Sequence, residues 1–376
     1  MHLLWGVAAG ALVAILLIWL GYPLAIWCAA RLVARPIRPN ATAAATRRVS
    51  VVLATREGPS VVAERVRNLF DTDHPASLLE VVVALDADGA QSGATSFDGL
   101  DDRVRVVKGD LPGGKACALN AAVRAATGEI LIFADTAQRF ERQTIPVLVA
   151  ALEDERFGAV SGALTLGSSA GASPMHWYWS MEKMLRYNES LIHSSIGVTG
   201  AVYATRRDLW PEPPAGTLLD DVFVPMALVL RGHRVGFAPA AKATDVRTFD
   251  NDAEKVRKTR TLTGVVQLLS LLPGIVSVRN PVVVQFVFHK LARLATPVLA
   301  ILMIMAALPA SVAFALQEPS ASLAIAAIVA LLLLVVPSLR ARTRDLLRWG
   351  WSLQEATLRA VVNGVLGRWG VWTRPK

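Results

Sequence analysis

Charged side chains recur directly after the apolar, β-rich runs in the first half of this chain. Glu57 follows VSVVLAT, Asp86 follows LEVVVAL, and Asp135 follows EILIFA. Lys115 comes after a Gly-Gly pair and opens the helix-forming segment KACALNAAVRAA. Because functional groups of parallel sheets gather at the carboxyl ends of the strands, we expect these four side chains at one site. A lysine at a glycine-rich turn and a carboxylate beyond a strand together predict an anion bound with a metal.

The segment GDLPGGKA (109–116) resembles a nucleotide-binding P-loop, and ILIFAD resembles the strand that accompanies one. A P-loop needs Ser or Thr directly after its lysine, because that hydroxyl binds Mg²⁺ together with the nucleotide phosphates. This chain has Ala116 at that position, and the loop follows the third predicted strand instead of the first. A P-loop ATPase therefore remains an alternative function, although this loop lacks the hydroxyl that would bind the metal.

An α/β domain is predicted to hold these residues. Strands are expected at 49–55, 79–89, 103–107 and 129–135, with helical spacing between them. Strands that alternate with helices imply a Rossmann-like, mainly parallel sheet covered on both faces. We place the boundaries of this domain at residues 47–250.

The start of the chain has a different composition. Residues 1–30 contain no Asp, Glu, Lys or Arg, and they exceed the about 20 residues that cross a bilayer. A cleaved signal peptide normally has a basic start and a short apolar core, and this segment has neither. We therefore predict a transmembrane anchor over 1–33. The five arginines between 31 and 48 place the following domain in the cytoplasm.

The end of the chain is also apolar. Leu294–Gln317 and Pro319–Leu339 are uncharged and long enough to cross a bilayer, which predicts a tight transmembrane hairpin within 291–339. The segment 251–290 is interrupted by Gly and Pro and is expected to form interfacial, amphipathic helices. The tail, 340–376, is predicted as a cytoplasmic amphipathic helix that lies on the membrane surface, with a fourth span as the alternative.

The overall charge points to membrane lipids as partners. The formal net charge is +9, and many of the basic residues lie beside the apolar runs, as expected for contact with anionic headgroups. No Lys/Arg block is interleaved with aromatic residues, so nucleic acid is not an expected partner. The two cysteines provide neither a disulfide framework nor a zinc site.

The order of the motifs resembles membrane-bound glycosyltransferases of family 2, which have a GT-A fold of the cellulose- and hyaluronan-synthase type. Six segments carry the resemblance, and they extend over about residues 47–300. They are VVLATRE (51–57), LDADG (85–89), GGKACALNAAVRAATGEILIFAD (113–135), TGAVYATRRDLW (199–210), LLDDVFVPMALVLRGHRVGFAP (218–239) and RKTRTLTG (257–264).

The resemblance implies a donor-binding set. Glu57 and Asp86 would contact the nucleoside of a nucleotide sugar. Lys115 and Arg260 would face its diphosphate, and Arg257 belongs to the same basic motif. A delocalised, permanently charged guanidinium suits a leaving diphosphate.

The resemblance also implies the catalytic residues. Asp135 would ligate Mg²⁺ or Mn²⁺, and Gly200 and Ala201 would lie on the acceptor side. Asp221 would be the general base, and its neighbour Asp220 can raise its pKa by charge repulsion. The two acids are also suited to capping a helix that begins at Val222, and the two roles are compatible.

Together these features predict an inverting transfer from a nucleotide sugar, with UDP as the expected nucleotide, to a saccharide or lipid-linked acceptor. The expected place is the bacterial inner membrane, in cell-envelope glycan synthesis. The usual D-x-D is reduced to Asp135-Thr136-Ala137, and the usual Trp after Arg260 is absent. These departures leave an alternative open, in which the chain is a catalytically degenerate glycosyltransferase-like subunit that serves only in assembly. Three predicted spans are few for a polymer channel, so an export partner is a further possibility.

Overall fold

The computed structural model describes residues 1–87, 97, 99–166, 174–246, 251–335 and 337–370. Its centre is an eight-stranded sheet with the order β3-β2-β1-β4-β7-β6-β8-β5. The strands are β1 (Val49–Thr55), β2 (Leu79–Leu85), β3 (Val104–Lys108), β4 (Ile130–Ala134), β5 (Gln138–Phe140), β6 (Phe157–Leu166), β7 (Val202–Arg206) and β8 (Arg234–Asp245).

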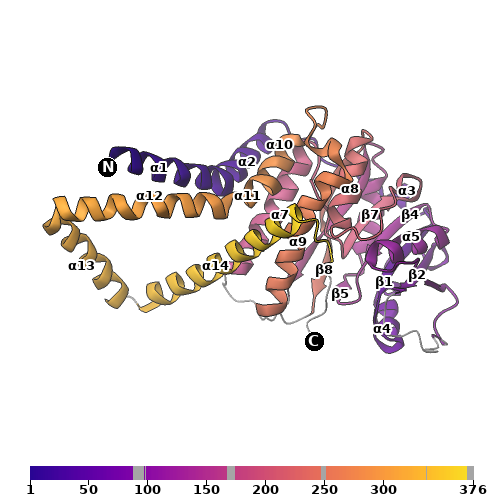
Figure 1. Ribbon diagram of the computed structural model, residues 1–376. Helices are drawn as coiled ribbons and strands as arrows, with labels where there is room; N and C mark the ends of the chain where they lie inside the picture. The colour runs from indigo at the N-terminus through magenta and orange to yellow at the C-terminus, as the bar shows by residue number, and fades with distance from the viewer. Residues whose placement is uncertain (88–96, 98, 167–173, 247–250, 336, 371–376) are drawn as a thin grey trace.

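Helices cover both faces of the sheet and continue into long apolar segments that leave it (Figure 1). Two of the helical turns, η1 and η5, are π-helical. The helical elements are α1 (His2–Leu16), η1 (Leu17–Gly21), α2 (Tyr22–Leu32), α3 (Ala41–Ala44), α4 (Pro59–Phe70), η2 (Ala76–Leu78), α5 (Lys115–Ala125), α6 (Thr144–Leu152), α7 (Pro174–Ile192), η3 (Arg207–Leu209), α8 (Asp220–Leu230), α9 (Asn251–Leu271), η4 (Pro273–Val276), α10 (Val283–Phe286), η5 (Val287–Leu291), α11 (Ala292–Leu294), α12 (Thr296–Gln317), α13 (Pro319–Val335) and α14 (Pro337–Val365).

The four strands predicted from apolar runs form the parallel half of the sheet. β1 pairs in parallel with β2 and β4, and β2 pairs in parallel with β3. Continuous apolar sequence is required in β1, β2 and β4 because both faces of these strands are buried, whereas the edge strand β3 is partly exposed. β7 then inserts antiparallel between β4 and β6, so the sheet is mixed but mainly parallel, as predicted.

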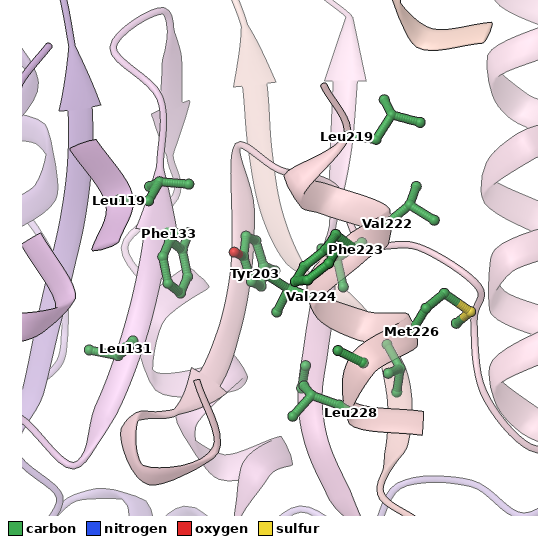
Figure 2. Packing of buried hydrophobic residues seen from close by; sticks show 14 of the residues in the cluster. Leu119, Leu131, Phe133, Tyr203, Leu219, Val222, Phe223, Val224, Met226 and Leu228 are labelled. Carbon is green, nitrogen blue, oxygen red and sulfur yellow. The ribbon is translucent and has the colours of Figure 1, made fainter. Parts of the chain in front are cut away.

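The core on one face of the sheet joins the strands to α5 and α8 (Figure 2). Phe133 of β4 stacks on Tyr203 of β7 with ring centroids 4.4 Å apart, and Trp210 stacks on Phe133 at 4.8 Å. Leu119 and Val224 close the same layer from the two helices. This packing fixes the end of β4 against the start of α8, where the acidic residues lie.

α9, which belongs to the segment predicted to be interfacial, packs against the residues that precede α8. A Cβ on Gly264 would lie 2.5 Å from the side chain of Leu219, so only glycine permits this approach. Gln267 accepts a hydrogen bond from the Leu218 backbone at 2.9 Å and donates to the Gly216 carbonyl at 3.0 Å. α9 therefore holds the loop that leads into α8.

Two helical segments in the described part of the chain are long and apolar enough to cross a membrane, His2–Leu32 and Thr296–Gln317. α1 runs along α12 (Figure 1). α13 follows α12 after the single residue Glu318 and leaves it at an angle, and the predicted transmembrane hairpin stays a prediction. The apolar side chains of α12 pack against α1, from the other end of the chain.

The C-terminal helix α14 docks on α9, and its predicted place on the membrane surface stays a prediction. Ala356 and Ala360 are fully buried, and a Cβ on Gly364 would lie 2.4 Å from Val266 of α9. Small residues at this spacing let the two backbones approach closely. The amphipathic pattern therefore serves a helix–helix contact.

Candidate active site

The ammonium of Lys115 lies between two carboxylates at the carboxyl edge of the parallel strands. Its Nζ is 3.0 Å from Asp135 Oδ1, beyond β4, and 3.7 Å from Asp220 Oδ2, at the start of α8. Burial opposes the charge on Lys115, but Asp135, Asp220 and Asp221 outweigh burial and raise its pKa. The structure therefore brings the predicted phosphate-binding lysine and the predicted metal ligand into direct contact.

Asp221 lies against the predicted acceptor-side segment. A Cβ on Gly200 would be 3.3 Å from Asp221 Cβ, and the Val198 N–H donates to the Asp221 carbonyl at 2.8 Å. Burial raises the pKa of the Asp221 carboxyl, and the charge of Asp220 raises it further. A raised pKa favours proton acceptance near neutral pH, as a general base requires. Ala201, the next predicted acceptor-side residue, is buried and leads into β7.

The two acids do not cap α8. The helix begins at Asp220, its N-cap is Leu219, and no side chain makes a capping hydrogen bond. Asp220 Oδ2 is buried and has no hydrogen-bond partner among the described residues. The first helical turn favours negative charge through the helix dipole, which helps to hold both carboxylates there.

The glycine-rich turn before Lys115 is held by Asp86. Gly114 has φ 91° and ψ 165°, a conformation that is essentially restricted to glycine. Its N–H donates to Asp86 Oδ1 at 2.7 Å, and Asp86 Oδ2 accepts from Arg56 Nε at 2.6 Å. Glu57 is exposed directly after β1. Asp86 therefore lies beside the turn with its side chain only 5% exposed, whereas Glu57 faces solvent.

Arg65 is a positioning residue that sequence reasoning missed. It is fully buried in α4, and its Nε donates to the Asp135 carbonyl at 2.9 Å. Burial lowers the pKa of the Arg65 guanidinium to about 9. An arginine within an amphipathic helix gives no sign of burial, so the sequence contains no signal for this contact.

The two arginines of α9 lie in different surroundings. Burial lowers the pKa of Arg260, while Asp221, Asp220 and Asp135 raise it, which places its guanidinium within electrostatic range of all three acids. The guanidinium of Arg257 instead lies over the ring of Trp179, 5.3 Å from its centroid. Arg260 lies within electrostatic range of the acidic cluster, and Arg257 contacts α7.

Two further cations next to Asp221 were also missed. Arg186 of α7 donates from Nη1 to Thr199 Oγ1 at 3.3 Å, directly before Gly200. Arg186 and Lys290 of η5 both lower the pKa of Asp221, against the effect of burial. They lie far from the recognisable motifs, and only the tertiary structure brings them to the site.

A divalent cation fits this site only with ligands from outside the chain. The described residues contain no group of three or more His, Cys, Asp or Glu that would hold a metal. Asp135 and Asp220 nevertheless both face the Lys115 ammonium, and Asp220 Oδ2 has no hydrogen-bond partner among the described residues. Two carboxylates completed by phosphate and water oxygens suit Mg²⁺ or Mn²⁺.

Residues 50–209 match the family model described as Glycosyl transferase family 2. No curated protein matches the sequence. Among solved structures, a mannosyltransferase from Pyrobaculum calidifontis in complex with GDP-Man and Mn²⁺ is 24% identical. The match covers 96% of this chain and 99% of that one, with a TM-score of 0.70, so the fold is shared along the whole length. Glucosyl-3-phosphoglycerate synthase from Mycobacterium tuberculosis, with Mg²⁺ and UDP, is 18% identical over 64% of this chain and 86% of that one, with a TM-score of 0.42.

Proposed function

We propose that this chain is a family 2 glycosyltransferase that performs an inverting transfer from a nucleotide sugar to a saccharide or lipid-linked acceptor, and the match of residues 50–209 to that family's model and the shared GT-A fold support the proposal. The observation that carries the proposal is the Lys115 ammonium held between Asp135 and Asp220 beside Asp221. The sequence favours a UDP-sugar. Because the archaeal relative was solved with GDP-Man, the test includes both nucleotide classes.

The donor would bind along the carboxyl edge of β1, β2 and β4. Glu57 and Asp86 would face the nucleoside, and Asp86 also fixes the turn through Gly114. The diphosphate would draw Lys115 away from Asp135, since an ammonium that already pairs with a carboxylate can exchange it for phosphate oxygens. Arg260 would approach the same leaving group from α9.

Asp135, with Asp220 opposite it, would hold Mg²⁺ or Mn²⁺ in the place that Lys115 vacates. When bound, such an ion neutralises charge on the diphosphate and so stabilises it as a leaving group. The ammonium and the metal would thus alternate between the same carboxylates. This exchange explains how a single D-x-D carboxylate can suffice.

The transfer step would use Asp221 as the base. Its carboxylate takes the proton of the acceptor hydroxyl while that oxygen forms a bond to the anomeric carbon. The bond from the anomeric carbon to the diphosphate oxygen breaks, and the electron pair leaves with the nucleoside diphosphate. Lys115 and Arg260 stabilise the charge that develops there, which is the main electrostatic requirement of the step.

We also propose that the chain is a multi-pass protein of the bacterial inner membrane with a cytoplasmic catalytic domain. The apolar side chains of α1 and α12 support this, because Leu12 is 45% exposed and Leu308 61% exposed. Apolar faces of this extent are costly in water. Two candidate spans in the described residues are too few to enclose a polymer channel, so a lipid-linked acceptor or an export partner completes the proposal.

A donor screen tests the function. The full chain in detergent is heated with Mn²⁺ and a panel of UDP- and GDP-sugars, and we expect one donor to raise the Tm. Stabilisation follows mass action and reaches about 2.7 kcal/mol at a hundredfold excess over Kd. Absence of any shift, together with no metal-dependent donor hydrolysis, would favour a degenerate assembly subunit.

The Lys115→Ala variant tests whether Lys115 binds the diphosphate of the donor. We expect a loss of donor-dependent stabilisation together with a loss of turnover. If the variant binds the nucleotide diphosphate as tightly as the native chain, the diphosphate role of Lys115 is wrong. Asp208→Asn, at an exposed acid of η3, is the matched control for handling and folding.

A further inference from the structure

α8 contains a proline in its interior, where this residue is the least favourable of all. The helix begins at Asp220, and the Phe223 N–H donates to the Leu219 carbonyl at 2.8 Å, in the regular pattern of an α-helix. Pro225 is the sixth residue of α8, beyond the first turn, in which an N–H has no helical partner and proline is tolerated. An unfavourable residue at this position suggests a local role for it.

The missing N–H is the one that would donate to the carbonyl of Asp221. Each N–H of an α-helix donates to the carbonyl four residues earlier, and Asp221 stands four residues before Pro225. The ring of a proline also clashes with that carbonyl, which disfavours its regular place in the helix. The Asp221 carbonyl instead accepts the Val198 N–H at 2.8 Å. The proline thus leaves the backbone of the proposed base open to a bond from outside the helix.

This bond comes from the segment Gly197–Gly200, which we call the acceptor wall. A Cβ on Gly197 would lie 3.4 Å from the Asp221 carbonyl oxygen, and a Cβ on Gly200 would lie 3.3 Å from Asp221 Cβ. The added Cβ on Gly200 would also be 3.8 Å from both Asp221 Oδ2 and Lys115 Nζ. The acceptor wall therefore packs against the backbone and the side chain of Asp221, beside the ammonium of Lys115.

Other hydrogen bonds hold the acceptor wall to the sheet and to α7. The Thr199 N–H donates to Ser161 Oγ of β6 at 2.8 Å. Arg186 of α7 donates from Nη1 to Thr199 Oγ1 at 3.3 Å. The bond from Val198 differs from these, because it joins the wall to the helix that carries the proposed base.

α7 is fixed in turn by the acceptor-side network, the buried charged residues Glu182, His289 and Arg293. Glu182 Oε2 lies 2.9 Å from His289 Nε2, and Glu182 Oε1 pairs with Arg293. The sheet and α7 thus support the acceptor wall from one side, and α8 holds it from the other.

We propose that Pro225 is a positioning residue, which frees the Asp221 carbonyl for the Val198 N–H and so ties the acceptor wall to the base. The proposal rests on the proposed function, in which Asp221 takes the proton of the acceptor hydroxyl. That hydroxyl must lie within hydrogen-bond reach of the carboxylate. A wall bonded to the backbone of the base keeps a constant distance from it, and a reaction between two positioned groups depends on such constancy.

Amide hydrogen exchange tests this bond in the full chain in detergent, without any substrate. Pro225→Ala restores an N–H to the helix, and we expect it to compete with the Val198 N–H for the Asp221 carbonyl. The Val198 amide should then exchange about threefold to tenfold faster, which corresponds to one hydrogen bond, and the new amide at position 225 should be protected. Pro225→Val keeps more of the buried volume and should give the same result.

Pro309→Ala is the matched control, because Pro309 is also a proline inside a helix, in α12. It should leave the exchange of the Val198 amide unchanged. Exchange at the native rate in both variants of Pro225 would overturn the proposal, since the Asp221 carbonyl would then accept both N–H groups without competition.

Turnover distinguishes a positioning role from a merely structural one. Hydrolysis of UDP-glucose and of GDP-mannose is followed with Mn²⁺, so that water takes the place of the acceptor. In Pro225→Ala we expect turnover to fall about threefold to tenfold, while the Tm stays equal or rises, because alanine favours the helix. The Tm shift induced by the nucleotide sugar should be unchanged. Native turnover, or a fall in turnover that is accompanied by a lower Tm, would overturn the positioning role.

The two measurements also separate this proposal from the proposed function. If the native chain neither binds nor hydrolyses any nucleotide sugar, the proposed function fails. The exchange of the Val198 amide still decides in that case whether Pro225 frees the Asp221 carbonyl.

Discussion

The proposed donor side and the proposed acceptor side of the candidate active site are assembled in different ways. On the donor side, Lys115 and Asp135 are 20 positions apart, and the consecutive elements α5 and β4 bring them together. On the acceptor side, Glu182 of α7 and His289 of η5 are 107 positions apart and meet only after the sheet and α9 are in place. Local geometry forms the first half, and long-range packing forms the second.

This difference predicts which changes act on one side alone. A residue fixed by a βα turn depends on backbone conformation within a few positions. A residue fixed by a buried charged network depends on every partner in it, because each partner removed leaves a desolvated charge. The effect of a substitution on activity, stability or pH dependence can therefore be assigned to the donor side or to the acceptor side.

The largest effect is expected from Asp221→Asn. Loss of the general base should lower turnover by about 10²- to 10⁴-fold and leave donor binding unchanged. Turnover and donor-induced Tm shifts are measured on the same preparation, with Asp208→Asn as control. Full turnover in the variant would show that another group accepts the proton.

Arg293→Met tests the acceptor-side network. It leaves Glu182 buried with only part of its compensation, so we expect a loss of about 3 kcal/mol of unfolding free energy. Chemical denaturation in detergent measures the loss. Arg279→Met removes an exposed cation and should be neutral. An equally small effect of both changes would mean that the network does not hold α7 to η5.

Gly114→Ala tests the donor-side turn. With φ 91° and ψ 165°, alanine should cost about 2 kcal/mol, although no atom lies near the added Cβ. The misplaced turn should also weaken donor binding through the lost Asp86 contact. Gly350→Ala is the same chemical change inside α14 with open space around it, and it should leave stability unchanged or slightly higher.

The smallest expected effect is a shift in the pH dependence of the rate, which depends on charges from both the donor side and the acceptor side. Burial and then Asp220 raise the Asp221 pKa, so the rate should fall as pH drops through a value above the ordinary carboxyl range. Asp220→Asn removes a negative charge and should move this acidic limb to lower pH. Arg186→Gln removes a positive charge and should move it to higher pH. Shifts in the same direction would contradict the arrangement of charges around Asp221.

The sequence by itself determined the parallel half of the fold. Buried parallel strands need continuous apolar runs, so the four runs from VSVVLAT to EILIFA could be located, and the functional side chains follow at their ends. The order of the motifs predicted a family 2 glycosyltransferase, and residues 50–209 match the model of that family. The roles of Glu57, Asp86 and the other predicted site residues stay predictions.

Only the tertiary structure decided how the remaining segments are used. The apolar and amphipathic patterns of α9, α12 and α14 indicate that a face of each helix must be covered. They do not indicate which segment of the chain covers it. α9 covers the loop before α8, α14 covers α9, and α1 covers α12. Arg186 and Lys290 reach Asp221 for the same reason, since their place depends on contacts between distant segments, which no local pattern records.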